Sequence, residues 1–324
     1  MCGTIFRTML LTVTPNPCVD RTYQLDHFEI NRVNRPTITY VMAGGKGINV
    51  ARVYRTLGGD ALALGFAGGI NAQVLRKALK MEGIPSHLIK VHGETRTCIA
   101  MIDSDTGTQT ELNEAGPLVN ERDCHELIRS VERLMDDNTV EVLSLSGSLP
   151  PGADPCLYAE LIGAANYHSV PVALDASGEA LLEGVQAKPW MVKVNKVEAG
   201  QLLGIEISSV QQCCNAAEEI WKQFGARMVI ITMGSEGAVQ FNGSGLRILV
   251  PPAIKFVSGV GSGDSFLAAY LYTLMKSDGH DAFNVAMGAG AANASVVGAG
   301  LCTREQIYSC SAGVRELSGV VRNV

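Results

Sequence analysis

The chain has 324 residues, 47% of them hydrophobic, so it can bury a sizeable core. A net charge of −6 argues against a nucleic-acid partner, and an anionic substrate would need a local group of positive charges. Nine cysteines without a C-x-x-C pair indicate neither a disulfide framework nor a zinc site and favour reduced thiols in the cytoplasm. No run of eighteen apolar residues and no signal-peptide pattern occurs, so neither a membrane nor secretion is expected.

Strand-like and helix-like runs alternate along the chain after a predicted N-terminal tail at residues 1–8. Short apolar and β-branched runs predict buried parallel strands at 10–14, 61–66, 140–146, 170–174, 191–194 and 228–232. Helices are predicted between or after them, at 48–57, 71–82, 120–135, 155–166, 197–203, 210–224, 265–275 and 281–297. This alternation predicts an α/β fold with a doubly wound, mostly parallel sheet.

Two segments depart from the alternation, at residues 19–41 and 95–112. Tyr, Phe, Ile, Val and Thr mix there with polar residues, as in half-exposed antiparallel strands. No repeat, low-complexity run or proline-rich linker divides the chain. Residues 9–324 are therefore predicted to form a single domain that carries a small, separate group of strands.

A glycine cluster, Ala43-Gly-Gly-Lys-Gly-Ile-Asn-Val-Ala51, precedes the first predicted helix. It is not a P-loop, which needs four residues between its first glycine and its Gly-Lys pair, and it is not a G-x-G-x-x-G dinucleotide loop. Glycine lets a ligand approach the backbone, while Lys46 and Asn49 could donate to a polyol or a phosphate. The structural alternative is a simple turn at the start of a helix.

A second cluster, Ser258-Gly-Val-Gly-Ser-Gly-Asp-Ser-Phe266, comes before an apolar helix. Gly261, Ser262 and Gly263 should present backbone N–H groups at the helix start, where phosphate binds well. Asp264 would then be close enough to take a proton from an alcohol that attacks a phosphorus. The structural alternative is an aspartate that only caps the helix.

Together the two clusters resemble the two signature segments of the ribokinase-like, or PfkB, family of sugar kinases, and the resemblance spans nearly the whole chain. Further segments are similar to its phosphosugar branch, at 14–20, 95–96, 111–117, 146–152, 175–180 and 193–198. The resemblance implies ATP-dependent phosphorylation of a ketohexose phosphate with Mg²⁺. Fructose 1-phosphate, phosphorylated at its 6-hydroxyl, is the preferred substrate, and tagatose 6-phosphate and fructose 6-phosphate stay open. It also implies that the two half-exposed segments form a lid through which a homodimer assembles.

The resemblance implies roles on the nucleotide side of the site. Asp264 would be the base, and Gly261, Ser262 and Gly263 the anion hole. Lys193 would reach the nucleotide phosphates, although it could instead be a solvent-facing strand end. The residues expected to line ATP are Thr232, Gly234 and Gly237. Asn195 and Glu198 are expected to hold Mg²⁺ through water. For the last pair, a salt-bridged helix start is the alternative.

On the sugar side, the resemblance assigns the glycines of the first cluster and four polar side chains to the substrate: Gly44, Gly45, Lys46, Asn49, Asp20 and Arg96. Asp20 and Asn49 would bind sugar hydroxyls, and Lys46 and Arg96 the existing phosphate. The structural alternatives are that Asp20 is only a turn residue and that Arg96 is an ordinary surface arginine. A sugar-phosphate sensor without catalysis is a competing function, whereas Pro15-Asn-Pro-Cys18 after the first strand argues against a dinucleotide-dependent oxidoreductase.

Overall fold

The computed structural model describes residues 9–276 and 282–317. The predicted tail at 1–8 lies outside the described residues. Ten strands form one sheet in the order β14-β13-β12-β11-β10-β9-β8-β1-β4-β5. Their bounds are β1 Met9–Thr14, β4 Ala61–Ala67, β5 Ser86–Lys90, β8 Val140–Ser146, β9 Val172–Asp175, β10 Met191–Asn195, β11 Met228–Thr232, β12 Ala238–Phe241, β13 Leu246–Val250 and β14 Arg315–Glu316.

Strand pairing confirms the predicted doubly wound sheet. Every neighbouring pair from β5 to β11 is parallel, and β12, β13 and β14 continue the sheet antiparallel. All six predicted strands are present, whereas β5 and β12 to β14 lie in segments for which no strand was predicted. The parallel strands are buried on both faces, which explains their continuous apolar runs.

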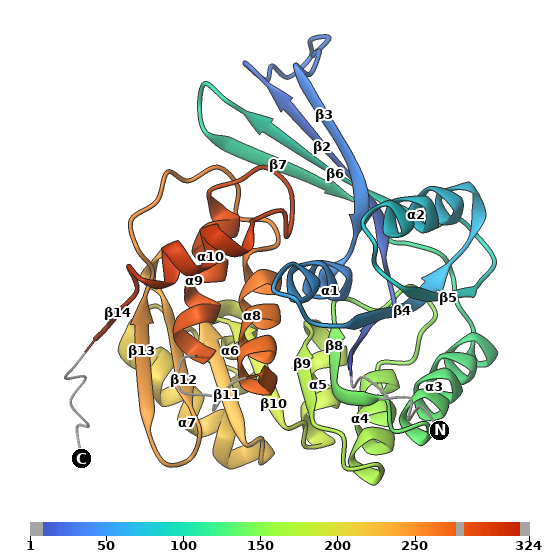
Figure 1. The fold of residues 1–324 in the computed structure, drawn as a ribbon, viewed down its shortest axis with the longest axis vertical. Helices are drawn as coiled ribbons and strands as arrows, with labels where there is room; N and C mark the ends of the chain where they lie inside the picture. The colour runs from blue at the N-terminus through green and yellow to red at the C-terminus, as the bar shows by residue number, and fades with distance from the viewer. Residues whose placement is uncertain (1–8, 277–281, 318–324) are drawn as a thin grey trace, which may run out of the picture.

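Helices cover both faces of this sheet (Figure 1). Their bounds are α1 Lys46–Thr56, α2 Gly69–Met81, α3 Glu121–Asp136, α4 Leu157–Tyr167, α5 Gly178–Gln186, α6 Lys196–Leu203, α7 Val210–Phe224, α8 Ser262–Lys276, α9 Ala282–Ala294 and α10 Arg304–Ser311. Successive strand residues point to opposite faces, so Leu10 belongs to the hydrophobic cluster under α1, α8 and α9, while Leu11 belongs to the cluster on the other face, with α3, α4 and α7. No helix within the described ranges is long and apolar enough to cross a membrane.

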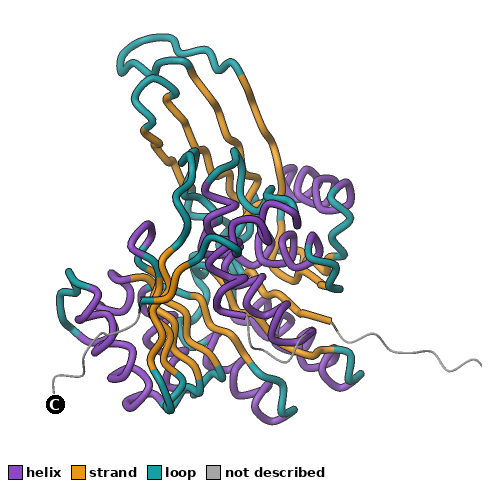
Figure 2. Tube along the Cα trace, turned by 60° about the vertical axis from the view of Figure 1, so that its left-hand side comes forward, coloured by secondary structure: helices purple, strands orange, loops and turns teal. Residues whose placement is uncertain are grey.

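A separate four-stranded sheet projects from one side of this body (Figures 1 and 2). It has the order β3-β2-β6-β7, with bounds β2 Cys18–Leu25, β3 Ile38–Gly44, β6 Arg96–Asp103 and β7 Thr108–Asn113. The strands fall in the two segments predicted to be half-exposed, although β2 and β6 pair in parallel rather than antiparallel. We call these four strands the lid sheet. Of these, β2 and β3 bring the chain from β1 back to the start of α1, beside the carboxyl ends of the parallel strands.

Candidate active site

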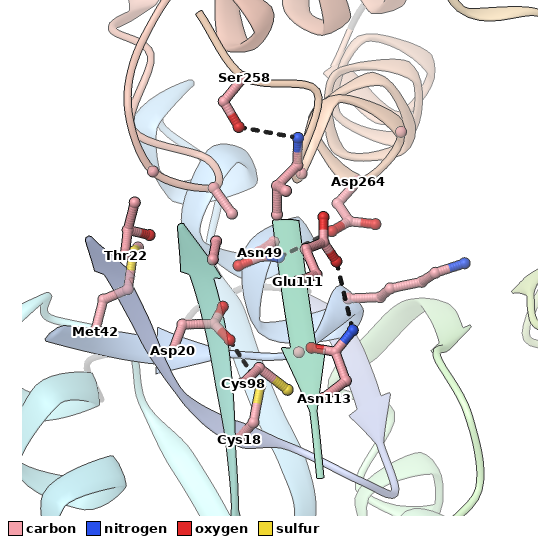
Figure 3. Close-up of a pocket in the computed structure, with 18 of the residues that line it drawn as sticks. Cys18, Asp20, Thr22, Met42, Asn49, Cys98, Glu111, Asn113, Ser258 and Asp264 are labelled. Atoms are coloured by element: carbon pink, nitrogen blue, oxygen red, sulfur yellow. Dashed lines mark hydrogen bonds between the residues drawn. The ribbon is translucent and has the colours of Figure 1, made fainter. Parts of the chain in front are cut away.

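A cavity of about 470 Å³ lies between the lid sheet and the main sheet (Figure 3). Its walls come from β2, β6 and β7, from the start of α1, and from the segment that enters α8. The floor includes residues at the carboxyl ends of three neighbouring parallel strands, Asp175, Asn195 and Thr232. Ligands of open α/β sheets bind at this edge because loops and helix starts leave room there.

Asp264 lies in the first turn of α8, which begins at Ser262, and its carboxylate accepts a hydrogen bond from Asn49 Nδ2 at 2.8 Å (Figure 3). The side chain therefore bonds α1 across the cavity. Burial raises the pKa of Asp264 to about 6, and Asp175 adds to the increase, while Lys46, Asn49 and Lys193 oppose it. Such a carboxylate is ionised at neutral pH yet basic enough to accept a proton from a bound alcohol.

The glycines before Asp264 are required by their surroundings. Gly261 has φ +78°, and a Cβ there would lie 2.6 Å from Cβ of Ala299. A Cβ on Gly263 would come within 3.2 Å of Lys193 Nζ. The N–H of Ser262 donates to Gly259 O at 3.2 Å, so that donor is engaged. The N–H of Gly263 belongs to the first helical turn, which lacks internal acceptors, and the nearby Lys193 ammonium adds positive charge for an anion.

Asp175 lies between two lysines at the cavity floor. Its Oδ1 is 2.8 Å from Lys46 Nζ and its Oδ2 is 2.6 Å from Lys193 Nζ. Burial acts to raise the pKa of Asp175, but the two ammonium groups outweigh it and hold the pKa at about 2. The three groups carry a net charge of +1, which favours a polyanionic nucleotide. Sequence reasoning assigned no role to Asp175, although it directly follows the strand predicted at 170–174, at the ligand-binding edge.

Asn195 and Glu198, the expected Mg²⁺ residues, line the cavity and form a reciprocal cap on α6. The N–H of Asn195 donates to Glu198 Oε2 at 2.8 Å, and the N–H of Glu198 donates to Asn195 Oδ1 at 2.9 Å. Glu198 Oε1 is 3.9 Å from Lys46 Nζ. With most of their oxygens bonded to the helix start, these residues fit a hydrated Mg²⁺ held through water better than a directly coordinated one.

The expected ATP loop contributes one residue to the cavity. Thr232 lines it at the end of β11, and its hydroxyl donates to Val194 O at 3.4 Å. Gly234 and Gly237 are not among the lining residues. A Cβ on Gly237 would lie 2.0 Å from Leu249 O, so packing against β13 is enough to require glycine there.

Asp20 faces the cavity from β2 (Figure 3). A Cβ on Gly44 would lie 2.1 Å from Cγ of Asp20, so any side chain at 44 would displace the carboxylate. Gly45 lines the cavity with φ +111°, a conformation that favours glycine. Burial raises the pKa of Asp20, while a hydrogen bond from Cys18 lowers it.

Arg96 lines the cavity, but its guanidinium is held by the backbone of neighbouring loops. Nε and Nη2 donate to Asn16 O at 3.1 and 2.9 Å, and Nη1 donates to Glu114 O at 3.4 Å. Carbonyl partners do not neutralise the charge, so Arg96 still contributes positive potential. Other lining residues were not singled out from the sequence; from the lid sheet they include Arg21, Cys98, Glu111 and Asn113.

Arg52 is a buried residue that sequence reasoning missed. Its Nη1 donates to Asn49 Oδ1 at 2.6 Å and to Ala299 O at 3.0 Å, and its Nε donates to Glu82 Oε2 at 2.7 Å. Asn49 is thereby turned so that its amide N–H faces Asp264. Arg52 is thus linked to Asp264 through the Asn49 side chain. The only signal in the sequence was an arginine inside an otherwise apolar helix pattern.

Fold and site together define a kinase that transfers a phosphoryl group to a carbohydrate, because an anion-binding helix start and a buried carboxylate meet in a covered cavity. A family model described as "pfkB family carbohydrate kinase" matches residues 13–306. The chain belongs to this family, whose members are ATP-dependent sugar kinases.

Two relatives and one solved protein illustrate the similarity. The 1-phosphofructokinase of Bacillus subtilis (strain 168) is 31% identical over 88% of this chain and 92% of its own. The tagatose-6-phosphate kinase of Staphylococcus epidermidis RP62A is 36% identical over 80% of this chain and 83% of its own. Phosphofructokinase-2 from Escherichia coli, solved in a tetrameric inhibited form and in complex with fructose-6-phosphate, superposes with a TM-score of 0.85 at 28% identity, over 94% of this chain and 98% of its own.

Proposed function

We propose that the protein phosphorylates a ketohexose phosphate, with fructose 1-phosphate, converted to fructose 1,6-bisphosphate, as the preferred substrate. Tagatose 6-phosphate and fructose 6-phosphate are the alternatives. The observation that carries the proposal is the buried Asp264 carboxylate, hydrogen-bonded to Asn49 at 2.8 Å at the boundary between the sugar side and the nucleotide side of one cavity.

In the proposed reaction, the sugar hydroxyl attacks the γ-phosphorus of ATP while Asp264 accepts the hydroxyl proton. The bond from phosphorus to the β–γ bridging oxygen breaks, and ADP leaves. Asp20 and Asn49 orient the hydroxyl, Lys46 and Arg96 bind the phosphate that the sugar already carries, and Lys193 attracts the nucleotide phosphates.

The start of α8 supplies the anion hole in this proposal, with Gly261, Ser262 and Gly263 around the transferred phosphoryl group. Thr232, Gly234 and Gly237 form the nucleotide loop. Mg²⁺ would neutralise phosphate charge, held through water by Asn195 and Glu198.

Two cationic side chains in the cavity support a substrate that already carries a phosphate. Arg96 and Lys46 both line the cavity, beside the carboxylates of Asp20, Glu111, Asp175, Glu198 and Asp264. The relatives named above act on or bind phosphorylated ketoses according to their names. The choice among the three sugars depends on one or two hydrogen bonds to hydroxyls.

We also propose a homodimer that forms through the lid sheet, in the cytoplasm. Val41 on β3 and Leu112 on β7 are 47% and 58% exposed, and the cross-strand row that joins them passes through Arg21 on β2 and Ile99 on β6, which both line the cavity. Exposed apolar side chains such as Val41 and Leu112 are commonly covered by a partner. All cysteines within the described ranges are free thiols, which suits a reducing compartment.

The test is ADP release with Mg-ATP and four sugars in parallel: fructose 1-phosphate, fructose 6-phosphate, tagatose 6-phosphate and ribose. We expect one preferred phosphosugar, and a loss of kcat of about 100- to 10,000-fold in Asp264→Asn. Asp105→Asn, in an exposed turn of the lid sheet, is the matched control and should keep full activity. Turnover of none of the sugars, together with ligand-dependent stabilisation, would favour a sensor; wild-type rates in Asp264→Asn would overturn the mechanism.

A further inference from the structure

Three side chains with metal-binding chemistry converge on the cavity side of the lid sheet. Cys18 and Asp20 are alternate residues of β2, so they share one face, and Cys98 on β6 lies in register with Asp20. All three line the cavity, and Figure 3 draws them next to one another below Asn49.

The ligand atoms of these residues are already close. The two Sγ atoms and an Asp20 carboxylate oxygen all lie within 4.8 Å of one another, and Cys18 Sγ donates to Asp20 Oδ1 at 2.9 Å. Within the part of the chain that the structure describes, no other set of three His, Cys, Asp or Glu side chains meets this condition. Cys18 is buried, whereas Cys98 is half-buried and reachable from the cavity.

We propose that Cys18, Asp20 and Cys98 bind a thiophilic divalent cation, with Zn²⁺ as the representative ion. Two sulfurs and one carboxylate oxygen are ligands that Zn²⁺ prefers, and the fourth position would open into the cavity. Ligand atoms around tetrahedral zinc lie about 3.3–3.8 Å apart, so small side-chain rotations suffice. Binding releases the two thiol protons to solvent, since the thiolates are the ligands.

The local charge favours this ion. Two thiolates and a carboxylate carry −3, which a divalent cation reduces to −1, and the Arg96 guanidinium is close by. Mg²⁺ does not compete here, because it requires oxygen ligands.

Occupation of the cluster has a consequence for the sugar. Asp20 cannot hold a cation and a sugar hydroxyl with the same oxygens, so Zn²⁺ should compete with the sugar and not with ATP. This second part rests on the proposed function, whereas binding of the ion does not.

Binding is tested on the full-length, reduced protein without substrate by titration with Co²⁺, which reports thiolate ligation as near-ultraviolet charge-transfer absorption and tetrahedral geometry as intense visible bands. We expect one Co²⁺ per chain with both signatures, displaced by Zn²⁺. Cys98→Ser should weaken binding by about tenfold or more and remove most of the charge-transfer band. Cys156→Ser, an exposed cysteine outside the cluster, is the matched control and should bind as the wild type does.

Cys18→Ser is a second test variant. The unfolding temperatures of Cys18→Ser, Cys98→Ser and Cys156→Ser show whether each variant keeps the fold. Should the buried Cys18 prove necessary for folding, Cys98→Ser at the half-buried position decides. A titration without a charge-transfer band, or with equal affinity in wild type and Cys98→Ser, would overturn the site.

Kinetics then test the competition. In the presence of Mg-ATP, Zn²⁺ should raise the apparent KM for the sugar phosphate in the wild type and in Cys156→Ser, leave the apparent KM for ATP unchanged, and have less effect in Cys98→Ser. Binding by Co²⁺ absorption without a change in the sugar KM would overturn the competition and leave the metal site standing. A protein that binds Co²⁺ but phosphorylates no sugar would contradict the proposed function alone.

Discussion

At the scale of single residues, the two buried carboxylates of the site differ in how fully neighbouring groups neutralise their charge. Asp175 is paired with two lysines and has a pKa of about 2, whereas Asp264, equally surrounded by protein, has one neutral donor at 2.8 Å and a pKa of about 6. Two carboxylates in one cavity therefore differ in basicity by several orders of magnitude. The less stabilised carboxylate is the one suited to take a proton.

The pH dependence of kcat/KM follows from this difference. Asp264 acts as a base when it is ionised, so kcat/KM should rise with pH through about 6 and level off above it. The substrate phosphate also titrates with a pKa of about 6, so the profile is compared with that of Asp264→Glu. The substrate contributes equally in both enzymes, and a limb that does not move between them would contradict Asp264 as the titrating group.

Arg52→Lys tests positioning through Asn49. Lysine cannot reproduce the set of bonds from one guanidinium to Asn49, Ala299 and Glu82, so Asn49 should lose its orientation. We expect kcat to fall by about tenfold. The Asn49 hydrogen bond lowers the pKa of Asp264, so the pH limb should also move upward.

Arg55→Lys, one turn further along α1 and more exposed, is the matched control for Arg52→Lys. A fall in unfolding temperature with an unmoved pH limb would mean that Arg52 only supports the fold.

At the scale of elements, the lid sheet and the start of α1 form one unit, because β3 runs directly into the glycine cluster. Ser258 Oγ, before α8, donates to Gln109 Oε1 on β7 at 2.8 Å, so the lid sheet also contacts the segment that enters α8. The lid sheet thus contacts both glycine clusters. We therefore expect small structural changes at its base to alter sugar binding.

Gly44→Ala is the element-scale prediction. The new methyl group would overlap the Asp20 carboxylate, so the KM for the sugar should rise by about tenfold or more while the KM for ATP stays near the wild-type value. Gly163→Ala, on α4 with open space around its Cβ, is the control. Steady-state kinetics with each substrate varied in turn make the measurement, and equal effects on both KM values would contradict Asp20 as a sugar contact.

At the scale of the whole molecule, the lid sheet projects from the main body (Figure 2). It exposes apolar side chains, Val41 and Leu112 among them. A thin sheet with two exposed faces is hard to stabilise alone, and a second copy of the chain would cover it. In the proposed homodimer, the second chain covers the exposed Val41 on β3 and Leu112 on β7.

Substitution of Val41 and Leu112 together by glutamate should convert the dimer to a monomer, because two buried charges per chain would oppose association. Light scattering after size-exclusion chromatography measures the mass. Ile70→Glu, at a 73% exposed apolar residue on α2, is the control and should leave the mass unchanged. A monomeric wild-type protein would contradict assembly through the lid sheet.

Local sequence pattern determined the parallel strands, most helices and both glycine clusters, because apolar periodicity and helix starts depend on neighbouring residues. It missed β5 at one sheet edge, where a polar strand lacks the buried pattern, and the antiparallel β12 to β14 at the other. The sequence analysis considered only cysteines close together in the chain. It therefore did not predict that Cys18 and Cys98 lie close together on the paired strands β2 and β6.

Tertiary structure alone decided which distant residues meet. Asn49 and Asp264 are 215 positions apart, and Lys46 and Asp175 are 129 apart, yet both pairs bond in one cavity. Parallel strands joined by helices bring all their carboxyl ends to the same edge of the sheet, and the lid sheet folds over that edge. Charge pairing, burial and the resulting pKa values arise only there, because they depend on distances through space and on the exclusion of water.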